Sequence, residues 1–360
     1  MAETKKIKER LLFSTITGSK LFGTESENSD TDIKGIFLPD IRNLILQNSS
    51  DLYDFSTNSN QKNTNEDIDE KYFSLQFFLN LISKGDSNCI DILFAYTNKK
   101  CTLHIDPLWE ELINNTDKFI SKNIIRSLQI CKSQCIKKHY KGEKLNLFIN
   151  LKNYVKKSIE DNKFKQKLTL ESILFKDYNI IYDENKKKEY YKNNRLIGYT
   201  YSQNLNGIGD NLDILKSFSK DNYLLINEYK FPLNERIVLI YEKLNSIINN
   251  YGDRTRKASE NKGADYKALS HCIRNIFEVE EIINKRKISF PLKDKQLEFV
   301  RSIKFKTTKM NYDEIIEWIS KKYDELNIKL IKESNLRDNP DKEWIDNFIL
   351  KCYDNKSIHK

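Results

Sequence analysis

No apolar run in this 360-residue sequence approaches the ~18–20 residues that a membrane span requires. The first residues, Met1–Lys6, also lack the apolar core of a secretory signal. Cysteines number only six, and none form a Cys-x-x-Cys pair. We therefore expect reduced cysteines in a cytoplasmic protein that does not associate with membranes.

Histidine is scarce as well, with four residues in the chain, and the sequence offers no convincing catalytic triad. Cys131, Cys135 and His139 recur at four-residue steps, which would place them on one face of a helix. Three ligands stacked on a single helix rarely close a tetrahedral zinc site. We interpret them as two reduced cysteines and a surface histidine rather than as a metal centre.

The composition that remains is that of a globular protein with a charged surface. Hydrophobic residues make up 39% and charged residues 31% of the chain, and the length suggests two or three domains. The net charge of +9 suits a nucleotide or nucleic-acid ligand.

Basic residues are densest between positions 137 and 167, where Phe148, Tyr154 and Phe164 are interleaved with lysines. Residues 186–192 repeat the pattern. We interpret the first stretch as a solvated helix face whose aromatic rings point inward. The alternative is a surface that stacks the bases of a tRNA-like or single-stranded acceptor.

The most informative segment contains Gly18-Ser19 and, twelve residues after Gly18, an Asp-x-Asp formed by Asp30 and Asp32. Residues two apart on a strand project to the same side, so the two carboxylates would occupy one small volume. Two like charges so close are costly unless a cation neutralises them. Carboxylate oxygens suit Mg²⁺ or Mn²⁺, which commonly bind together with substrate phosphates. A Gly-Ser turn that opens a helix can present backbone N–H groups and a hydroxyl to such phosphates.

This arrangement resembles the DNA polymerase β-type nucleotidyltransferase superfamily, whose signature is Gly-Ser, a short helix and Asp-x-Asp on a strand. Gly18-Ser19 with Gly23, then Ser29–Asp32 and Lys34–Phe37, looks like a bacterial and phage branch of predicted nucleotidyltransferases linked to RNA repair. The resemblance implies an α+β fold, in which a small mixed β-sheet, palm-like nucleotidyltransferase domain is followed by a larger, mainly α-helical region.

The superfamily needs a third carboxylate on a neighbouring strand, about four positions before an aromatic-Ser-Leu that opens a helix. Asp69 stands four residues before Phe73 and is our choice. Asp67 and Glu70 are close competitors, and Asp91 is a weaker one.

By the same resemblance, Asp30 and Asp32 would hold two metal ions, Mg²⁺ or Mn²⁺, and Asp69 would complete the ion that activates the acceptor hydroxyl. Ser19 would bind the phosphates that leave as pyrophosphate. Positioning of the reactants and neutralisation of their charge would account for most of the rate enhancement.

A third constellation lies near the C-terminus. If residues from Tyr266 onward form a helix, Lys267, His271, Arg274 and Glu278 lie along one stripe, opposite an apolar stripe. A polar stripe is ordinarily the solvated side of a helix. The same branch carries Asp-x-Lys-x-x-x-His-x-x-Arg here, which implies nucleotide binding by Lys267, His271 and Arg274. Arg274 is alternatively structural, paired with Glu278.

The segment that follows departs from the family pattern. The branch usually continues with an Arg-Gly-type turn, whereas this sequence reads Lys304-Phe305-Lys306.

We divide the chain into three regions. Residues 1–105 are the nucleotidyltransferase domain, with strands at 11–17, 32–38 and 68–73, a polar loop at 48–65 and a helix that begins near Ser74. Residues 106–233 form a helical region, with helices at 108–113, 120–138 and 145–159 and a lineage-specific, mixed segment. Residues 234–360 form a C-terminal helical domain that contributes to the nucleotide site.

Two functions are open. The first is an enzyme that transfers a nucleoside monophosphate from an NTP, with ATP preferred, to a hydroxyl of an RNA end, a protein or a nucleotide. The second is a catalytically silent nucleotide- or RNA-binding sensor. The sequence does not fix the acceptor or the oligomeric state.

Overall fold

A computed structural model describes residues 11–27, 29–56, 68–161, 167–170, 172–173, 223–226 and 229–357. The chain divides into two compact units, one formed by residues 1–135 and 266–360 and the other by residues 136–265. Each unit has its own hydrophobic core. Helix α8 (Ile125–Asp161) begins in the first unit and ends in the second.

Both ends of the chain thus build the first unit. The division into three regions that we drew from the sequence uses other boundaries and remains a prediction. The predicted α+β class is confirmed, because a small mixed sheet in the N-terminal part is followed by mostly helical structure.

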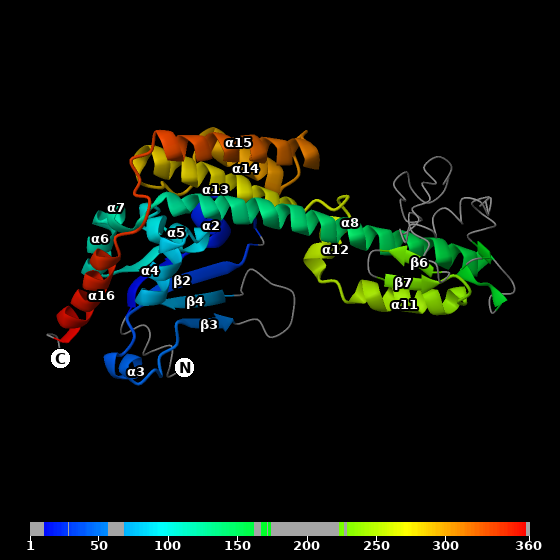
Figure 1. Ribbon diagram of the computed structural model, residues 1–360, viewed down its shortest axis with the longest axis horizontal. Helices are drawn as coiled ribbons and strands as arrows, with labels where there is room; N and C mark the ends of the chain where they lie inside the picture. Colours follow the sequence, from blue (N-terminus) through cyan, green and yellow to red (C-terminus); the bar gives the residue numbers. More distant parts are fainter. Residues whose placement is uncertain are drawn as a thin grey trace, which may run out of the picture. The chain divides into compact units, whose positions relative to one another are not determined.

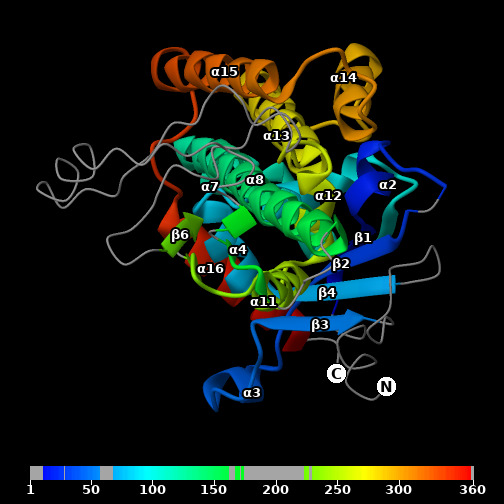
Figure 2. The ribbon, with the colours of Figure 1, turned by 90° about the vertical axis from the view of Figure 1, so that its right-hand side faces the viewer.

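A mixed five-stranded sheet is the framework of the first unit, with strand order β3-β4-β2-β1-β5. Strands β2 and β4 are parallel, and every other neighbouring pair is antiparallel. Figure 2 shows β3, β4, β2 and β1 side by side in this order. The strands are β1 (Leu11–Ile16), β2 (Thr31–Phe37), β3 (Leu52–Ser56), β4 (Ile68–Ser74) and β5 (Thr102–Ile105).

The two faces of this sheet have different neighbours. Ile36 and Phe73, which are paired across β2 and β4, join the main core. Phe37 and Tyr72 instead join a small aromatic cluster with Leu11, Tyr53 and Phe55. Alternate residues of a strand point to opposite faces, so the main core and the aromatic cluster lie on opposite sides of the sheet.

Gly35 fixes the register of the parallel pair on the aromatic side. It is the partner of Tyr72, and a Cβ atom at Gly35 would lie only 2.5 Å from the Tyr72 ring. Tyr72 is almost fully buried at 2% exposure, so its ring occupies the space that a side chain at position 35 would need. A glycine is therefore required opposite Tyr72.

Helices cover the main-core side of the sheet, and helices from the C-terminal part of the chain complete the unit (Figure 1). Ser74 accepts a hydrogen bond from Phe77 N and begins α4, as its position in the sequence predicts. The helices are α2 (Gly18–Phe22), α3 (Ile41–Ile45), α4 (Leu75–Ser83), α5 (Ser87–Phe94), α6 (Pro107–Asn114), α7 (Thr116–Phe119), α13 (Tyr266–Lys285), α14 (Asp294–Lys304), α15 (Tyr312–Lys332) and α16 (Lys342–Ser357), with short 3₁₀ turns at Ala95–Thr97 and Lys122–Ile124.

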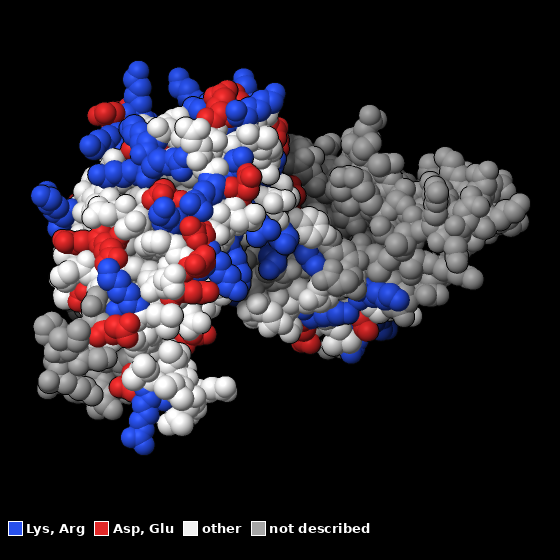
Figure 3. All heavy atoms as spheres, turned by 60° about the vertical axis from the view of Figure 1, so that its left-hand side comes forward, with Lys and Arg blue, Asp and Glu red and all other residues white. Residues whose placement is uncertain are grey.

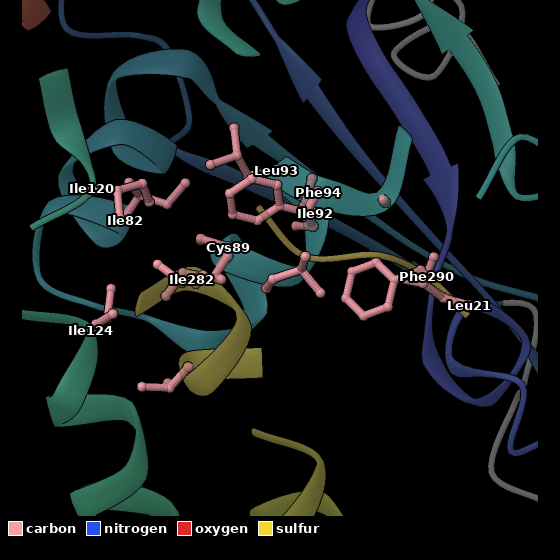
Figure 4. Packing of buried hydrophobic residues seen from close by; sticks show 14 of the residues in the cluster. Leu21, Ile82, Cys89, Ile92, Leu93, Phe94, Ile120, Ile124, Ile282 and Phe290 are labelled. Atoms are coloured by element: carbon pink, nitrogen blue, oxygen red, sulfur yellow. The ribbon is translucent and has the colours of Figure 1, made fainter. Parts of the chain in front are cut away.

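Segments far apart in the sequence meet in the core of this unit. Figure 4 shows Cys89 of α5 beside Ile282 of α13, and Leu21 of α2 beside Phe290, which follows α13. A backbone hydrogen bond reinforces the contact between Leu21 and Phe290, since Leu292 N donates to Phe22 O at 3.3 Å. The short helix α2 is therefore held by the chain between α13 and α14.

The described residues of the second unit form helices and a pair of antiparallel strands. The unit contains the last part of α8, the antiparallel strands β6 (Tyr223–Ile226) and β7 (Tyr229–Pro232), α11 (Ile237–Asn249) and α12 (Asp253–Ser259). Gly142 of α8 approaches Gly263 so closely that a Cβ at position 142 would lie 2.8 Å from Gly263 Cα. Among the described residues, no helix has both the length and the apolar character needed to cross a membrane.

Several sequence predictions of secondary structure need correction. The predicted polar loop at 48–65 contains strand β3, and strand β5 was not predicted. The two predicted helices at 120–138 and 145–159 are one continuous helix, α8. A glycine usually weakens a helix, but Gly142 is tolerated because Gly263 leaves no room for a side chain there.

Candidate functional site

Strand pairing brings two of the predicted carboxylates together. Asp32 of β2 and Asp69 of β4 are direct register partners in the parallel pair. Side chains of such partners project to the same side of a sheet, from strands about 4.8 Å apart. Asp30 lies two residues before Asp32, immediately before β2 begins. The three residues therefore lie at one end of the sheet, and the charges of Asp30 and Asp69 both act on Asp32.

The Gly18-Ser19 turn lies against the same carboxylates. Thr17 N donates to Asp32 O at 2.7 Å, which ties the end of β1 to β2. Gly18 has a φ of +66°, and a Cβ at this position would lie 2.4 Å from Asp32 Oδ2. Only glycine combines this backbone conformation with so close an approach. Ser19, the second residue of α2, is half-buried next to it.

The electrostatics of Asp32 reflect this crowding. Burial raises the pKa of the Asp32 carboxyl, and the carboxylates of Asp30 and Asp69 raise it further. Lys34 and Lys267 act in the opposite direction and lower that pKa. The described residues thus leave Asp32 short of positive charge, although two lysines from different elements lie within electrostatic reach.

A cation suits this donor set, because carboxylate oxygens are hard ligands and the crowding of Asp32 would be relieved by positive charge. Within the described residues, no group of three or more His, Cys, Asp and Glu side chains is already gathered as a metal site. Metal binding by Asp30, Asp32 and Asp69 therefore remains a proposal.

The other acidic candidates lie elsewhere. Glu70 accepts a hydrogen bond from the Tyr72 hydroxyl at 2.8 Å, and it is on the face of β4 opposite to that of Asp69. Asp91 is buried inside the unit and pairs with Arg274 at 3.0 Å. Asp67 lies outside the described residues. Asp69 is therefore the candidate that the strand register places beside Asp32.

The predicted stripe on the C-terminal helix forms as α13, and its residues divide into two kinds. Lys267 is exposed, and its charge acts on Asp32. His271 is half-buried, and Arg274 Nη2 lies 2.6 Å from His271 Nδ1. If Arg274 donates this hydrogen bond, the His271 ring carries its proton on Nε2.

Arg274 is a structural residue by its contacts. Its guanidinium pairs with Asp91 and Glu278, and its Cζ lies 3.6 Å from the centre of the Phe22 ring in α2. At 3% exposure it has little access to solvent. Of the two roles that the sequence left open for Arg274, these contacts favour the structural one, and they connect α13 to α5 and α2.

Two acids share this single guanidinium. Burial raises the pKa of Glu278 well above its ordinary value, although Arg274 opposes the shift. Asp91 adds a further increase through its charge and a hydrogen bond. Burial raises the pKa of Asp91 as well, so burial favours the neutral form of both acids and the positive charge of Arg274 opposes it.

The remaining sequence features stay outside this site. Phe148 and Tyr154 are buried in the core of the second unit, where the Tyr154 hydroxyl donates to Ile173 O at 2.7 Å. These two rings face inward, which agrees with our interpretation of the basic stretch as a solvated helix face with buried aromatic residues. Phe164 and residues 186–192 lie outside the described residues. Figure 3 shows a face on which basic and acidic side chains are intermixed, so the positive net charge does not form a field of one sign there.

The six cysteines are buried, and none of them forms a disulfide bond. Burial raises the pKa of Cys131 to about 11, which keeps this thiol protonated at neutral pH. Its Sγ accepts a hydrogen bond from Asn275 Nδ2 at 3.4 Å. His139 is 18% exposed at its side chain, so it is not the surface residue that we expected, and its Nε2 lies 3.3 Å from Glu143.

A comparison with protein families bears directly on the Gly-Ser turn and the carboxylates. Residues 1–154 match the RNA repair pathway DNA polymerase beta family. This match confirms the predicted resemblance to the polymerase β-type nucleotidyltransferase branch. The matched residues include the whole five-stranded sheet and all three candidate carboxylates.

A relative of the whole chain is also known. An uncharacterized 38.9 kDa protein in the nrdC-mobD intergenic region of Enterobacteria phage T4 is 24% identical over 349 residues. The similarity covers 93% of this chain and 95% of the phage protein, so it reaches beyond the family match into the C-terminal helices. No solved structure matches the chain.

Lys304 lies beside the site, and the sequence alone did not identify it as a candidate. Lys304, at the end of α14, donates to Thr24 O just after the turn that follows α2. The signal was the departure from the family pattern at Lys304-Phe305-Lys306, where a lysine stands in place of the usual Arg-Gly turn.

Proposed function

We propose that this protein is a metal-dependent nucleotidyltransferase, which transfers a nucleoside monophosphate from an NTP to a hydroxyl acceptor and releases pyrophosphate. The observation that carries the proposal is the direct register pairing of Asp32 with Asp69, with Asp30 two residues away. The family match of residues 1–154 supports the same reaction class.

The reaction follows from simple bond changes. The acceptor oxygen forms a bond to the α-phosphorus of the NTP, the bond from that phosphorus to the bridging oxygen breaks, and pyrophosphate leaves. Such a transfer leaves little covalent work for the protein, so positioning and charge neutralisation determine its rate. When bound, Mg²⁺ or Mn²⁺ supplies the neutralising charge and lowers the pKa of the acceptor hydroxyl.

The residues of this chain have separate parts in that scheme. Asp30 and Asp32 would hold the ions beside the triphosphate, and Asp69 would complete the ligands on the acceptor side. Gly18 allows the backbone to approach Asp32 closely, and Ser19 can donate its hydroxyl to a phosphate. Lys267 offsets negative charge near Asp32, and His271, which Arg274 contacts through Nδ1, would bind the base, ribose or a phosphate of the nucleotide.

The test is incubation of the purified chain with each α-³²P-labelled NTP, Mg²⁺ or Mn²⁺, and total RNA. We expect label on RNA, on protein or on a small product, with ATP as the preferred donor. Asp30→Ala and Asp32→Ala should abolish it, whereas Asp346→Ala, at an exposed position of α16, should not. Unchanged transfer by Asp32→Ala would contradict the assignment of the metal ligands.

The same experiment distinguishes the enzyme from the alternative, a catalytically silent sensor. A sensor would bind nucleotide without metal, would transfer no label under any condition, and would be indifferent to Asp32→Asn. That set of results would replace the enzymatic proposal.

A further inference from the structure

Three cationic side chains gather beside the segment that follows α2. Lys304 Nζ donates to Thr24 O at 2.6 Å, and Arg301 Nη1 donates to Gly23 O at 3.0 Å. Both residues belong to the last turn of α14. Lys267, from the first turn of α13, lies within electrostatic reach of Lys304. Two helices thus direct positive charge to the same place.

No carboxylate of the described residues forms an ion pair with any of these three cations. This is unlike Lys122 and Lys351, which pair with acids at 2.8 and 2.7 Å. Burial lowers the pKa of Lys304, and the nearby charges of Lys267 and Arg301 lower it further. The charges of Glu25 and Asp30 oppose this shift without cancelling it, so an anion bound at the half-buried Lys304 would be favourable.

The cations also lie close to the acidic residues. The charge of Asp30 acts on Lys304, and the charge of Lys267 acts on Asp32. Asp32, whose pKa is raised by burial and neighbouring carboxylates, is therefore near cations that form no ion pair with a carboxylate of the described residues. A metal-bound triphosphate supplies a counter-charge to both, since its metal suits the carboxylates and its terminal phosphates suit ammonium and guanidinium groups.

We propose that Lys304, together with Arg301 and Lys267, binds the β- and γ-phosphates of the nucleotide. The assignment rests on the proposed function, and it adds α14 to the site. The Lys304 ammonium has three donors, of which Thr24 O takes one, so two remain for phosphate oxygens. Its hydrogen bond to Thr24 O places the ammonium at the C-terminal end of α2, the short helix that begins with Gly18 and Ser19.

The test measures binding rather than turnover. Calorimetric titrations with ATP, AMP and inorganic tripolyphosphate, each with Mg²⁺, would be made on the wild-type chain, Lys304→Gln, Lys304→Arg and Lys295→Gln. Lys295 is an exposed lysine of the same helix and serves as the matched control. Loss of a charge-assisted phosphate contact should weaken ATP and tripolyphosphate binding by about tenfold. AMP binding should be unchanged, and Lys304→Arg and Lys295→Gln should bind like the wild type.

The outcomes separate this assignment from the proposed function. The assignment is overturned if Lys304→Gln binds ATP as tightly as the wild type does. It is also overturned if the variant loses as much affinity for AMP as for ATP, or if the wild type binds neither ATP nor tripolyphosphate. Wild-type binding with the expected Lys304 effect, but without label transfer, would retain the phosphate site and reject the enzyme. If Lys304→Gln melts at a lower temperature than the wild type, Arg301→Gln, at an exposed position, replaces it in the same titrations.

Discussion

The first unit contains two groups of acidic residues that differ in how their charge is balanced. Asp91 and Glu278 are buried and share the guanidinium of Arg274. Asp32 and its neighbours Asp30 and Asp69 are half-buried at the end of the sheet, where lysines reduce the repulsion without forming an ion pair with Asp32. The first group has its counter-charge within the protein, whereas Asp32 in the second group forms no ion pair with a lysine or arginine of the described residues.

This difference separates structure from function in one small region. An arginine that is always protonated suits a permanent role, since it holds α13 against α5 and α2. Under the proposed function, the second group exchanges a metal-bound nucleotide, and a permanent guanidinium partner would compete with the metal for its carboxylates. The two groups should therefore respond in opposite ways when charge is removed from them.

The largest effect is expected from Arg274→Leu. Removal of the guanidinium leaves two buried carboxyl groups without their cation, which costs about 3–5 kcal/mol of unfolding free energy. Urea unfolding followed by circular dichroism measures the loss. A change below about 1 kcal/mol would show that the buried network contributes little to the fold.

The next effect concerns activity rather than stability. Asp32→Ala should lower the rate of nucleotide transfer by at least about 10²–10³-fold, since it removes a preorganised charge from the reacting centre. Its melting temperature should remain at or above that of the wild type. A parallel loss of stability would make Asp32 a structural residue like Asp91.

Lys267→Ala should have a smaller effect. If Lys267 binds phosphate in the ground state, KM for the NTP rises by about tenfold while kcat changes less. Initial rates over a range of NTP concentrations separate the two parameters. A fall in kcat at unchanged KM would instead place Lys267 on the transition state.

The charge balance of Asp32 itself predicts a small gain in stability. Its pKa is raised in the folded protein, so the cost of its charge is absent below the ordinary carboxyl pKa and appears as pH rises through the raised value. In EDTA at pH 7, Asp32→Asn should gain less than about 1 kcal/mol, because solvent screens the site. The gain should vanish at low pH. Urea unfolding across pH 3–8 tests this, and a gain that grows as pH falls would contradict it.

The smallest effect is expected on the surface of α13, the helix that carries Arg274. Lys285 pairs with Glu281 at 3.2 Å and is 69% exposed at its side chain. Lys285→Ala should change the unfolding free energy by less than about 0.5 kcal/mol. Urea unfolding of this variant beside Arg274→Leu compares a surface pair with a buried network on one helix.

Local patterns in the sequence predicted the elements that carry the site. The Asp-x-Asp after Gly18-Ser19 placed β2, Ser74 marked the start of α4, and the stripe from Lys267 onward gave α13. These features depend on neighbours a few residues away, which a single sequence contains.

Features that depend on distant partners were not predictable in the same way. Arg274 reaches Asp91 across 183 residues, and no local pattern specifies that pair. Strand β3 was taken for a loop because its Tyr53 and Phe55 pack in the small aromatic cluster rather than in the main core. The glycine at position 142 within α8 is explained by the close approach of Gly263, which lies far along the chain.

The fit of the Tyr72 ring over Gly35 has a genetic consequence. This pair lies on the face of the sheet opposite to the carboxylates, in the same two strands whose register places Asp32 opposite Asp69. A side chain at position 35 would have to displace the ring or shift the strands. A random screen for inactive mutants should therefore recover substitutions of Gly35 alongside those of the carboxylates, although position 35 touches no substrate.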